Sequence, residues 1–237
     1  MKIKKIISSA MLLCCGLSLS GCGGSLKDLN KQLEKVLDAD EKNEIYGDEY
    51  RISTTKKTGS IEAVDMVMKK DGDKLYLYTK DSNFWIGKKN DKHYVFYSDE
   101  NTKEYTEITE GKSQSLIAEI ETKVQKFVTT QTKLVEEIVS YTKLCDKEKI
   151  ACEIEKNMFG TEISFDFERE DGGVPQEFEV EIEKGKITEY YRKTIVSDKV
   201  VTTSTTFDYG NQEVKIPSND GYTLNASVLS YLDNIGL

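Results

Sequence analysis

The stretch Glu177-Phe178-Glu179-Val180-Glu181-Ile182-Glu183 alternates strictly between glutamate and apolar residues. Successive side chains of a β-strand point to opposite faces, so this period of two predicts a strand with one dry and one wet face. Residues 162–168 repeat the pattern, with Ile163, Phe165 and Phe167 on the apolar side. Both stretches are therefore predicted to be strands of an antiparallel sheet.

Strand patterns continue on both sides of these stretches. Further strands are predicted on the carboxyl side at Ile187–Val196 and Lys199–Tyr209, with a short segment at Val214–Ile216. On the amino side the predicted strands are Tyr50–Thr55, Ile61–Lys69, Lys74–Thr79, Phe84–Ile86, His93–Tyr97 and Lys103–Ile108. Their connections are too short for crossover helices, so an antiparallel meander is expected.

Helical periodicity marks three other parts of the chain. Residues 25–38 predict an amphipathic helix, and Leu224–Leu232 predicts a closing one. Ser115–Leu144 carries a long apolar stripe that is interrupted where Gln131 takes an expected apolar position. The interruption predicts two consecutive helices or one bent helix.

Together these patterns predict an α+β fold, in which a curled antiparallel β-sheet forms an open half-barrel with helices covering its concave face. Three stretches resemble the LolA-like and LppX-like lipoproteins: Asp71-Gly72-Asp73-Lys74-Leu75-Tyr76-Leu77-Tyr78, Lys92-His93-Tyr94-Val95-Phe96-Tyr97, and Thr205-Thr206-Phe207-Asp208-Tyr209-Gly210 leading to Val214-Lys215-Ile216-Pro217. The resemblance covers most of residues 26–217.

The resemblance implies a hydrophobic cavity between sheet and helices, which some members use to carry acyl chains. Its expected lining residues are Leu75, Leu77, Phe165, Phe167, Phe178, Val180, Ile120 and Val124. The same residues fit a filled core equally well, so both interpretations stay open at this point.

The first residues have the form of a bacterial export signal. Lys2, Lys4 and Lys5 precede a mostly apolar stretch over residues 6–19. Leu19-Ser20-Gly21-Cys22 resembles the lipobox of bacterial lipoproteins, which implies cleavage before Cys22 and lipid on its thiol. The predicted organisation is a signal peptide over 1–21, a lipidated tether over 22–25, and a single half-barrel domain over 26–237.

Net charge excludes one class of partner. Loss of the three lysines with the leader takes the formal charge from −9 to −12. Such a chain is repelled by nucleic acid and by anionic lipid head groups. We therefore expect no nucleic-acid binding, and membrane attachment that is hydrophobic.

Two cysteines remain for the folded body once Cys22 carries lipid. Cys145 and Cys152 are close in sequence and can form a disulfide in an exported chain, or stay reduced and partly buried. A zinc site is not expected, because His93 is the only histidine. Asp71 and Asp73 lack the further ligands that calcium needs.

Motifs for catalysis are not found. The sequence has no glycine-rich phosphate loop, no GxSxG and no HExxH. His93 is interpreted as a surface or half-buried residue, Trp85 as a packing residue, and the glutamates of residues 177–183 as a solvated strand face. No enzymatic activity, metal or cofactor is therefore expected.

The expected function is that of a lipoprotein on the outer face of the cytoplasmic membrane, anchored by lipid on Cys22, that binds or carries a lipid or another apolar ligand. The alternative is a structural or regulatory surface lipoprotein that binds a partner protein and has no ligand cavity. The sequence identifies neither the ligand nor the protein partner.

Overall fold

The computed structural model describes residues 26–41, 46–145, 150–156, 160–167, 176–197, 199–233 and 235. The chain divides into two compact units, and each is described by itself. The first unit comprises Met1–Ile45, Lys56–Ala63 and Thr129–Thr206, and the second comprises Tyr46–Thr55, Val64–Val128 and Phe207–Leu237. The predicted single domain over residues 26–237 stays a prediction.

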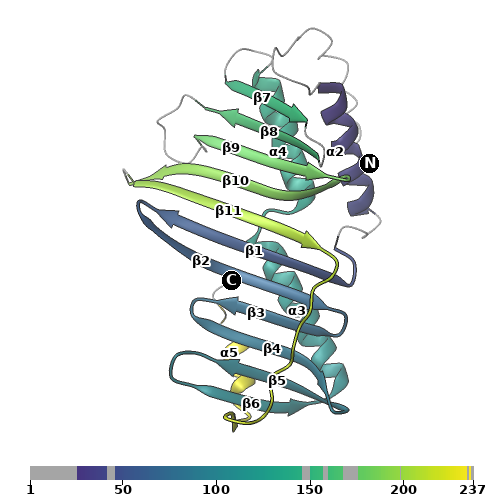
Figure 1. The fold of residues 1–237 in the computed structure, drawn as a ribbon, viewed down its shortest axis with the longest axis vertical. Coiled ribbons are helices and arrows are strands. Elements are labelled where there is room, and N and C mark those ends of the chain that lie inside the picture. Colours follow the sequence, from purple (N-terminus) through teal and green to yellow (C-terminus); the bar gives the residue numbers. More distant parts are fainter. Residues whose placement is uncertain are drawn as a thin grey trace. The chain divides into compact units, whose positions relative to one another are not determined.

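The described chain combines helices with strands (Figure 1). The helices are α2 (Leu26–Glu41), α3 (Glu110–Phe127), α4 (Gln131–Cys145) and α5 (Val228–Asp233). The strands are β1 (Glu49–Thr58), β2 (Ile61–Asp71), β3 (Lys74–Thr79), β4 (Ser82–Lys89), β5 (Lys92–Ser98), β6 (Lys103–Ile108), β7 (Ala151–Lys156), β8 (Gly160–Asp166), β9 (Glu177–Glu183), β10 (Lys186–Val196), β11 (Lys199–Tyr209) and β12 (Thr223–Leu224).

These strands follow the order β12-β6-β5-β4-β3-β2-β1-β11-β10-β9-β8-β7 in one 12-stranded sheet. The two end strands, β12 and β7, do not pair with each other, so the sheet is open. The predicted fold class is confirmed, since the chain is α+β and its sheet is open. Strands β1 to β6 and strands β7 to β11 each follow the chain order, and β1 lies beside β11. One pair departs from the antiparallel pattern, because the short β12 runs parallel to β6.

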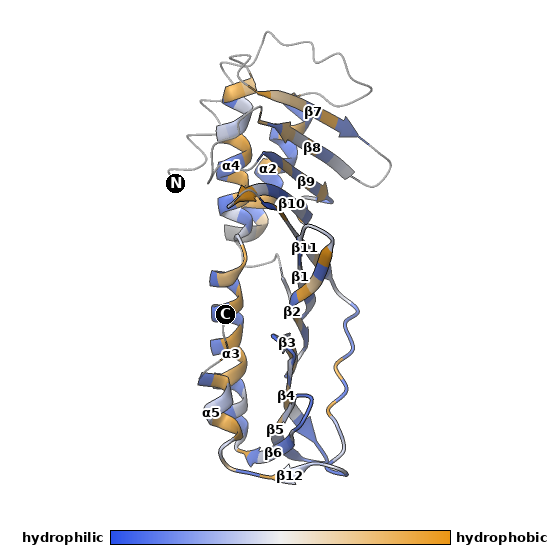
Figure 2. Ribbon diagram, turned by 90° about the vertical axis from the view of Figure 1, so that its left-hand side faces the viewer, coloured by the Kyte–Doolittle hydropathy of each residue, from blue (hydrophilic) through white to orange (hydrophobic). Residues whose placement is uncertain are grey.

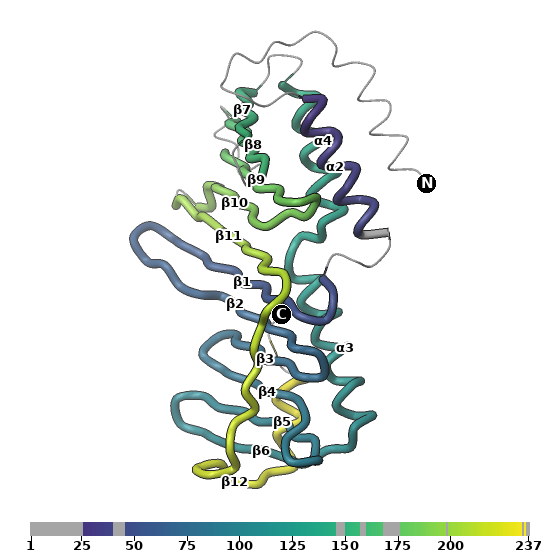
Figure 3. The backbone as a smooth tube through the Cα atoms, turned by 45° about the vertical axis from the view of Figure 1, so that its right-hand side comes forward, coloured from purple at the N-terminus to yellow at the C-terminus, as the bar shows by residue number. Residues whose placement is uncertain are grey.

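In the first unit, helices α2 and α4 pack on each other, and α2 contacts β10 while α4 contacts β7. Phe165 pairs with Phe178 and Ile163 with Val180 in the antiparallel register of β8 and β9. This register places the apolar side chains of both strands on the face that the helices cover. The β10–β11 hairpin lies beside the β1–β2 hairpin (Figure 3), and the Gly59 N–H donates to the Val200 carbonyl at 3.3 Å.

In the second unit, β3 to β6 form a meander covered by α3, which contacts β4 and β5, and by α5, which contacts β5 and β6. Helix α3 carries an apolar stripe (Figure 2). Leu116, Ile117, Ile120 and Val124 are the buried apolar residues of that stripe. The Thr109 hydroxyl caps α3 by accepting from the Lys112 N–H, which fixes where the helix begins.

The predicted interruption of the central helical stretch is confirmed, since α3 ends at Phe127 and α4 begins at Gln131. Gln131 is only 1% exposed. Its side-chain amide donates to the Ile187 carbonyl at 3.2 Å and accepts from the Ile187 N–H at 2.9 Å. The glutamine at an apolar position of the stripe is therefore buried against a strand rather than exposed.

Some predicted elements were wrong in extent. The closing helix is shorter than predicted, because residues 223–224 form β12 and α5 begins only at Val228. Val214–Ile216 is not a strand, although Val214 is buried and its N–H donates to the Asp71 carboxylate at 3.2 Å. Strand β7 was not predicted. Its alternation is weak, because Ile154 is its one fully buried side chain.

Candidate functional site

The residues predicted to line an apolar cavity are all buried, but they fall into two groups. Leu75, Leu77, Ile120 and Val124 belong to the second unit, whereas Phe165, Phe167, Phe178 and Val180 belong to the first. Each side chain is at most 4% exposed. The structure therefore places the predicted lining in two separate groups rather than one.

The aromatic group of the first unit is packed around Tyr141 of α4. The centroid of the Tyr141 ring lies 5.4 Å from that of Phe165, 4.7 Å from Phe167 and 5.4 Å from Phe178, in each case edge to face. Phe165 and Phe178 stack on each other at 6.1 Å. Edge-to-face and offset contacts at these separations are favourable, so Tyr141 occupies the space in front of these rings. The packing favours the filled-core interpretation for this group.

Arg192 adds a charge on the helix side of the same strands. Its guanidinium lies 4.9 Å from the ring centroid of Phe178 and 5.4 Å from that of Tyr190. It also donates to the carboxylate of Glu137 in α4 and, at 3.4 Å, to the Thr129 hydroxyl. Burial raises the pKa of Tyr141, and Glu137 adds to that rise while Arg192 opposes it.

Arg192 was not predicted from the sequence as a site residue. Alternation counted from the buried Ile187 would turn Tyr191 toward the helices and Arg192 away from them. A β-bulge between Ile187 and Glu189 reverses the alternation, so that Tyr190 pairs with Val180 and Arg192 with Phe178. The strand pattern alone gives no sign of the bulge.

The second unit also has a charged group on its helix side. The Lys70 ammonium lies 3.1 Å from the Glu121 carboxylate of α3, and the Tyr50 hydroxyl donates to the same carboxylate at 2.6 Å. The Lys70 and Glu121 side chains are 17% and 20% exposed. Burial raises the pKa of Tyr50 far above its ordinary value, and the Glu121 carboxylate adds to the rise. This group ties β1 and β2 to α3.

A pocket lies on the opposite, acidic face of the first unit. It encloses about 280 Å³ and is lined by Glu162, Glu179, Val180, Glu181, Glu189 and Tyr191. Glu181 of β9 pairs directly with Glu162 of β8 on one side and with Glu189 of β10 on the other. Three carboxylates therefore lie in one row across neighbouring strands. We call the pocket the acidic depression.

Burial is the main cause of the altered titration of the acidic depression. It raises the pKa of Glu181, and repulsion from Glu183, Glu162 and Glu189 adds to the rise. The pKa of Glu179 is raised in the same way, by burial first and then by its acidic neighbours. These side chains are half-buried, so this strand face is solvated only in part.

The chemistry of the acidic depression suits a cationic group and not an acyl chain, because carboxylates line it. Part of its hydrogen-bonding capacity is already used, since the Ser204 hydroxyl donates to Glu189 at 2.6 Å. Among the residues that the structure describes, no group of three or more His, Cys, Asp or Glu side chains is arranged to hold a metal ion.

The other residues singled out in the sequence have structural surroundings. His93 is half-buried in β5. Trp85 packs on Tyr76, with ring centroids 5.3 Å apart. The Asp71 carboxylate binds the Lys74 ammonium at 3.3 Å, in addition to the Val214 N–H. None of these residues contributes to the acidic depression.

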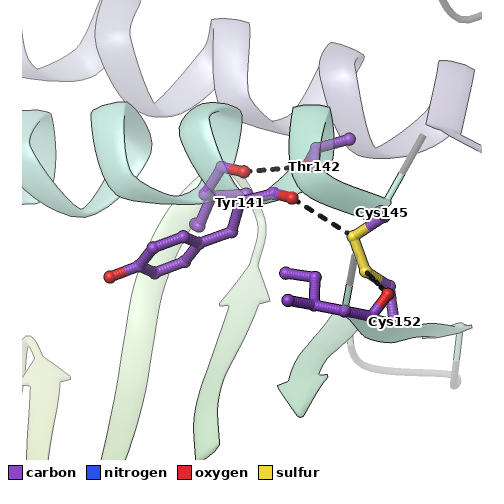
Figure 4. The surroundings of a disulfide bond; sticks show 6 residues. Tyr141, Thr142, Cys145 and Cys152 are labelled. Carbon is purple, nitrogen blue, oxygen red and sulfur yellow. Dashed lines mark hydrogen bonds between the residues drawn. A yellow bond between two sulfur atoms is a disulfide. The ribbon is translucent and has the colours of Figure 1, made fainter. Parts of the chain in front are cut away.

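Cys145 and Cys152 form a disulfide, with Cα atoms 6.0 Å apart (Figure 4). The bond joins the last residue of α4 to β7, the strand at one end of the sheet. Nearby in α4, the Thr142 hydroxyl donates to the Ile138 carbonyl at 2.7 Å.

Cys22 and the predicted leader lie outside the described residues. Within the described part of the chain, no helix has both the length and the apolar character needed to cross a bilayer.

Comparisons with known proteins give only a distant structural similarity. No family model and no curated protein matches the sequence. Among solved structures, the chain is similar to the crystal structure of a DUF1329 family protein from Desulfovibrio piger ATCC 29098. The two are 8% identical, the match covers 80% of this chain and 95% of the other, and the TM-score is 0.21. Similarity at this level assigns neither a family nor a ligand.

Proposed function

We propose that this chain is a lipoprotein on the outer face of the cytoplasmic membrane, anchored by lipid on Cys22. The support is the order of the first residues: a lysine-rich start, an apolar stretch, and small residues directly before the cysteine. The two acyl chains of a diacylglyceryl group on that thiol would contribute on the order of 20 kcal/mol, so the attachment would be stable. The proposal includes no catalytic step.

We further propose that the folded body binds a partner protein through its surface rather than carrying an apolar ligand inside. The observation that carries this choice is the packing of Tyr141 against Phe165, Phe167 and Phe178. An acyl chain would have to displace a ring that contacts three others. The second group of predicted lining residues is likewise at most 2% exposed.

The carrier function remains the second candidate, because helices cover an apolar sheet face in each unit. Native mass spectrometry separates the two functions. Protein purified from bacterial membranes in mild detergent would be measured after the anchor mass is accounted for. A consistently empty protein supports partner binding. A stoichiometric lipid beyond the anchor would establish the carrier function instead.

Anchoring is tested separately by metabolic labelling with an alkyne fatty acid. The unchanged chain is expected to incorporate the label and to partition into detergent. The Cys22→Ser variant should lose both properties, whereas Cys145→Ser should keep them. Labelling that survives Cys22→Ser would overturn the proposed anchor.

A further inference from the structure

Two neighbouring hairpin tips of the first unit expose large apolar side chains. Ile61 at the β1–β2 tip is 74% exposed, and Val196 and Val200 at the β10–β11 tip are 56% and 44% exposed. The bond from the Gly59 N–H to the Val200 carbonyl holds the two tips side by side (Figure 3). We call residues 56–61 together with 195–197, 199 and 200 the tip pair. Exposed apolar residues that gather in this way indicate an interaction surface.

The apolar residues of the β10–β11 tip lie on both of its faces. Val200 pairs with Ile195, and Val196 pairs with Lys199 in the next register position. Adjacent register positions point to opposite faces, so Val196 and Val200 project in opposite directions. A flat protein surface would contact one face only. Apolar groups on both faces suit a medium that surrounds the tip, as the interfacial region of a bilayer does.

The charge at the tip pair differs from that of the chain. Lys56, Lys57 and Lys199 are exposed there, and these lysines outnumber the one carboxylate that the sequence places in the β10–β11 turn, Asp198. Glu62 follows Ile61 directly and is exposed, so the excess of lysines is small, but its sign is opposite to the net charge of −9 of the chain. Lysines beside apolar side chains complement the phosphates of an anionic membrane surface.

We infer that the tip pair inserts into the surface of an anionic phospholipid bilayer. Ile61, Val196 and Val200 enter the interface, and Lys56, Lys57 and Lys199 contact lipid phosphates. The proposed anchor brings this surface near a membrane, but the contact itself does not depend on Cys22. The general repulsion of an acidic body from anionic lipid is thus overcome locally, at one end of two hairpins.

Vesicle flotation of the mature chain, made without lipid by Cys22→Ser, tests the inference. The probes are vesicles of phosphatidylglycerol and vesicles of phosphatidylcholine. We expect binding to the anionic vesicles that falls on the order of 100-fold in the Ile61→Asn/Val196→Asn/Val200→Asn variant. The Lys56→Gln/Lys57→Gln/Lys199→Gln variant should lose roughly fivefold per lysine on anionic vesicles and nothing on neutral ones.

Leu224→Asn is the matched control, because Leu224 is 65% exposed but lies outside the tip pair. This variant should bind vesicles as tightly as the parent chain does. Circular dichroism must show the same unfolding temperature for all variants. Absence of vesicle binding by the parent chain, or unchanged binding by the apolar triple variant, overturns the inference. A concentration-dependent dimer that the triple variant abolishes, without vesicle binding, would assign the tip pair to a second copy instead.

Discussion

The two units cover a sheet with helices in different ways. In the first, aromatic rings surround Tyr141, and a disulfide joins the covering helix α4 to β7. In the second, α3 has an aliphatic stripe, the strands have aromatic contacts of their own such as Phe96 on Tyr105, and the Lys70–Glu121 pair with Tyr50 joins helix to strands. Reduction of the disulfide or truncation of a ring is expected to destabilise the first unit. Loss of a hydrogen bond to the half-buried ion pair is expected to destabilise the second. The same layer arrangement therefore predicts different sensitivities in its two halves.

The largest effect is expected from Phe178→Ala. Phe178 is fully buried, stacks on Phe165 and lies beneath Tyr141 and Arg192. Its loss should lower the free energy of unfolding by about 3–5 kcal/mol in urea denaturation. The matched variant Leu77→Ala in the second unit should lower it by about 2–4 kcal/mol. A cost below about 1 kcal/mol for Phe178→Ala would show that the ring cluster does not carry the stability of the first unit.

The second largest loss of stability is expected from the Cys145→Ser/Cys152→Ser variant, which lacks the disulfide. The disulfide closes a short loop, since the two cysteines are seven residues apart. Loop-closure entropy predicts a loss of about 2–3 kcal/mol. Hydrogen exchange should show faster opening of β7 and β8 with little change in β3 to β6. Equal acceleration in both units would contradict the assignment of the bond to the first unit alone.

Tyr50→Phe is expected to have a smaller effect in the second unit. The change removes the hydrogen bond to Glu121 but leaves that carboxylate paired with Lys70. A loss of about 1–2 kcal/mol is expected from chemical denaturation. Tyr78→Phe is the control, since the hydroxyl of Tyr78 bonds Asp81 at an exposed site. Similar costs for the two variants would mean that burial of the Tyr50–Glu121 bond has no consequence.

The smallest expected effect is that of Glu181→Gln in the acidic depression. The pKa of Glu181 is raised in the folded state, so the folded protein binds a proton more readily than the unfolded chain does. The glutamate therefore destabilises the fold at neutral pH and ceases to do so as pH falls below its unfolded value of about 4.3. Glu181→Gln should unfold at a slightly higher temperature at pH 7 and at the same temperature as the parent near pH 3.

The matched control for that measurement is Glu155→Gln, because Glu155 is exposed on β7. It should leave the unfolding temperature unchanged at both pH values. A Glu181→Gln variant that is less stable at pH 7 than the parent would mean that the carboxylate makes favourable contacts that outweigh its crowding.

Local periodicity was enough to predict most of the fold. The alternation around Phe178 and Phe165 predicted β8 and β9, and the interrupted stripe predicted a break or a bend where α3 ends and α4 begins. What could not be predicted depends on partners distant in sequence. Arg192 faces α4 because of a bulge, and the short β12 exists through pairing with β6. The lining residues of the proposed cavity looked like one set because alternation identifies a face but not the unit that it belongs to.

Gln131 shows what a polar residue inside an apolar stripe can accomplish. Its amide has the same donor and acceptor as a peptide group, and it bonds both backbone groups of Ile187, beside the bulge that turns Arg192 toward α4. Rotating or sliding α4 by one residue would break both of these buried hydrogen bonds. Gln131 therefore favours one rotation and one axial position of α4 over β10. An aspartate side chain is too short to reach both backbone groups of Ile187, and a leucine side chain has neither a donor nor an acceptor.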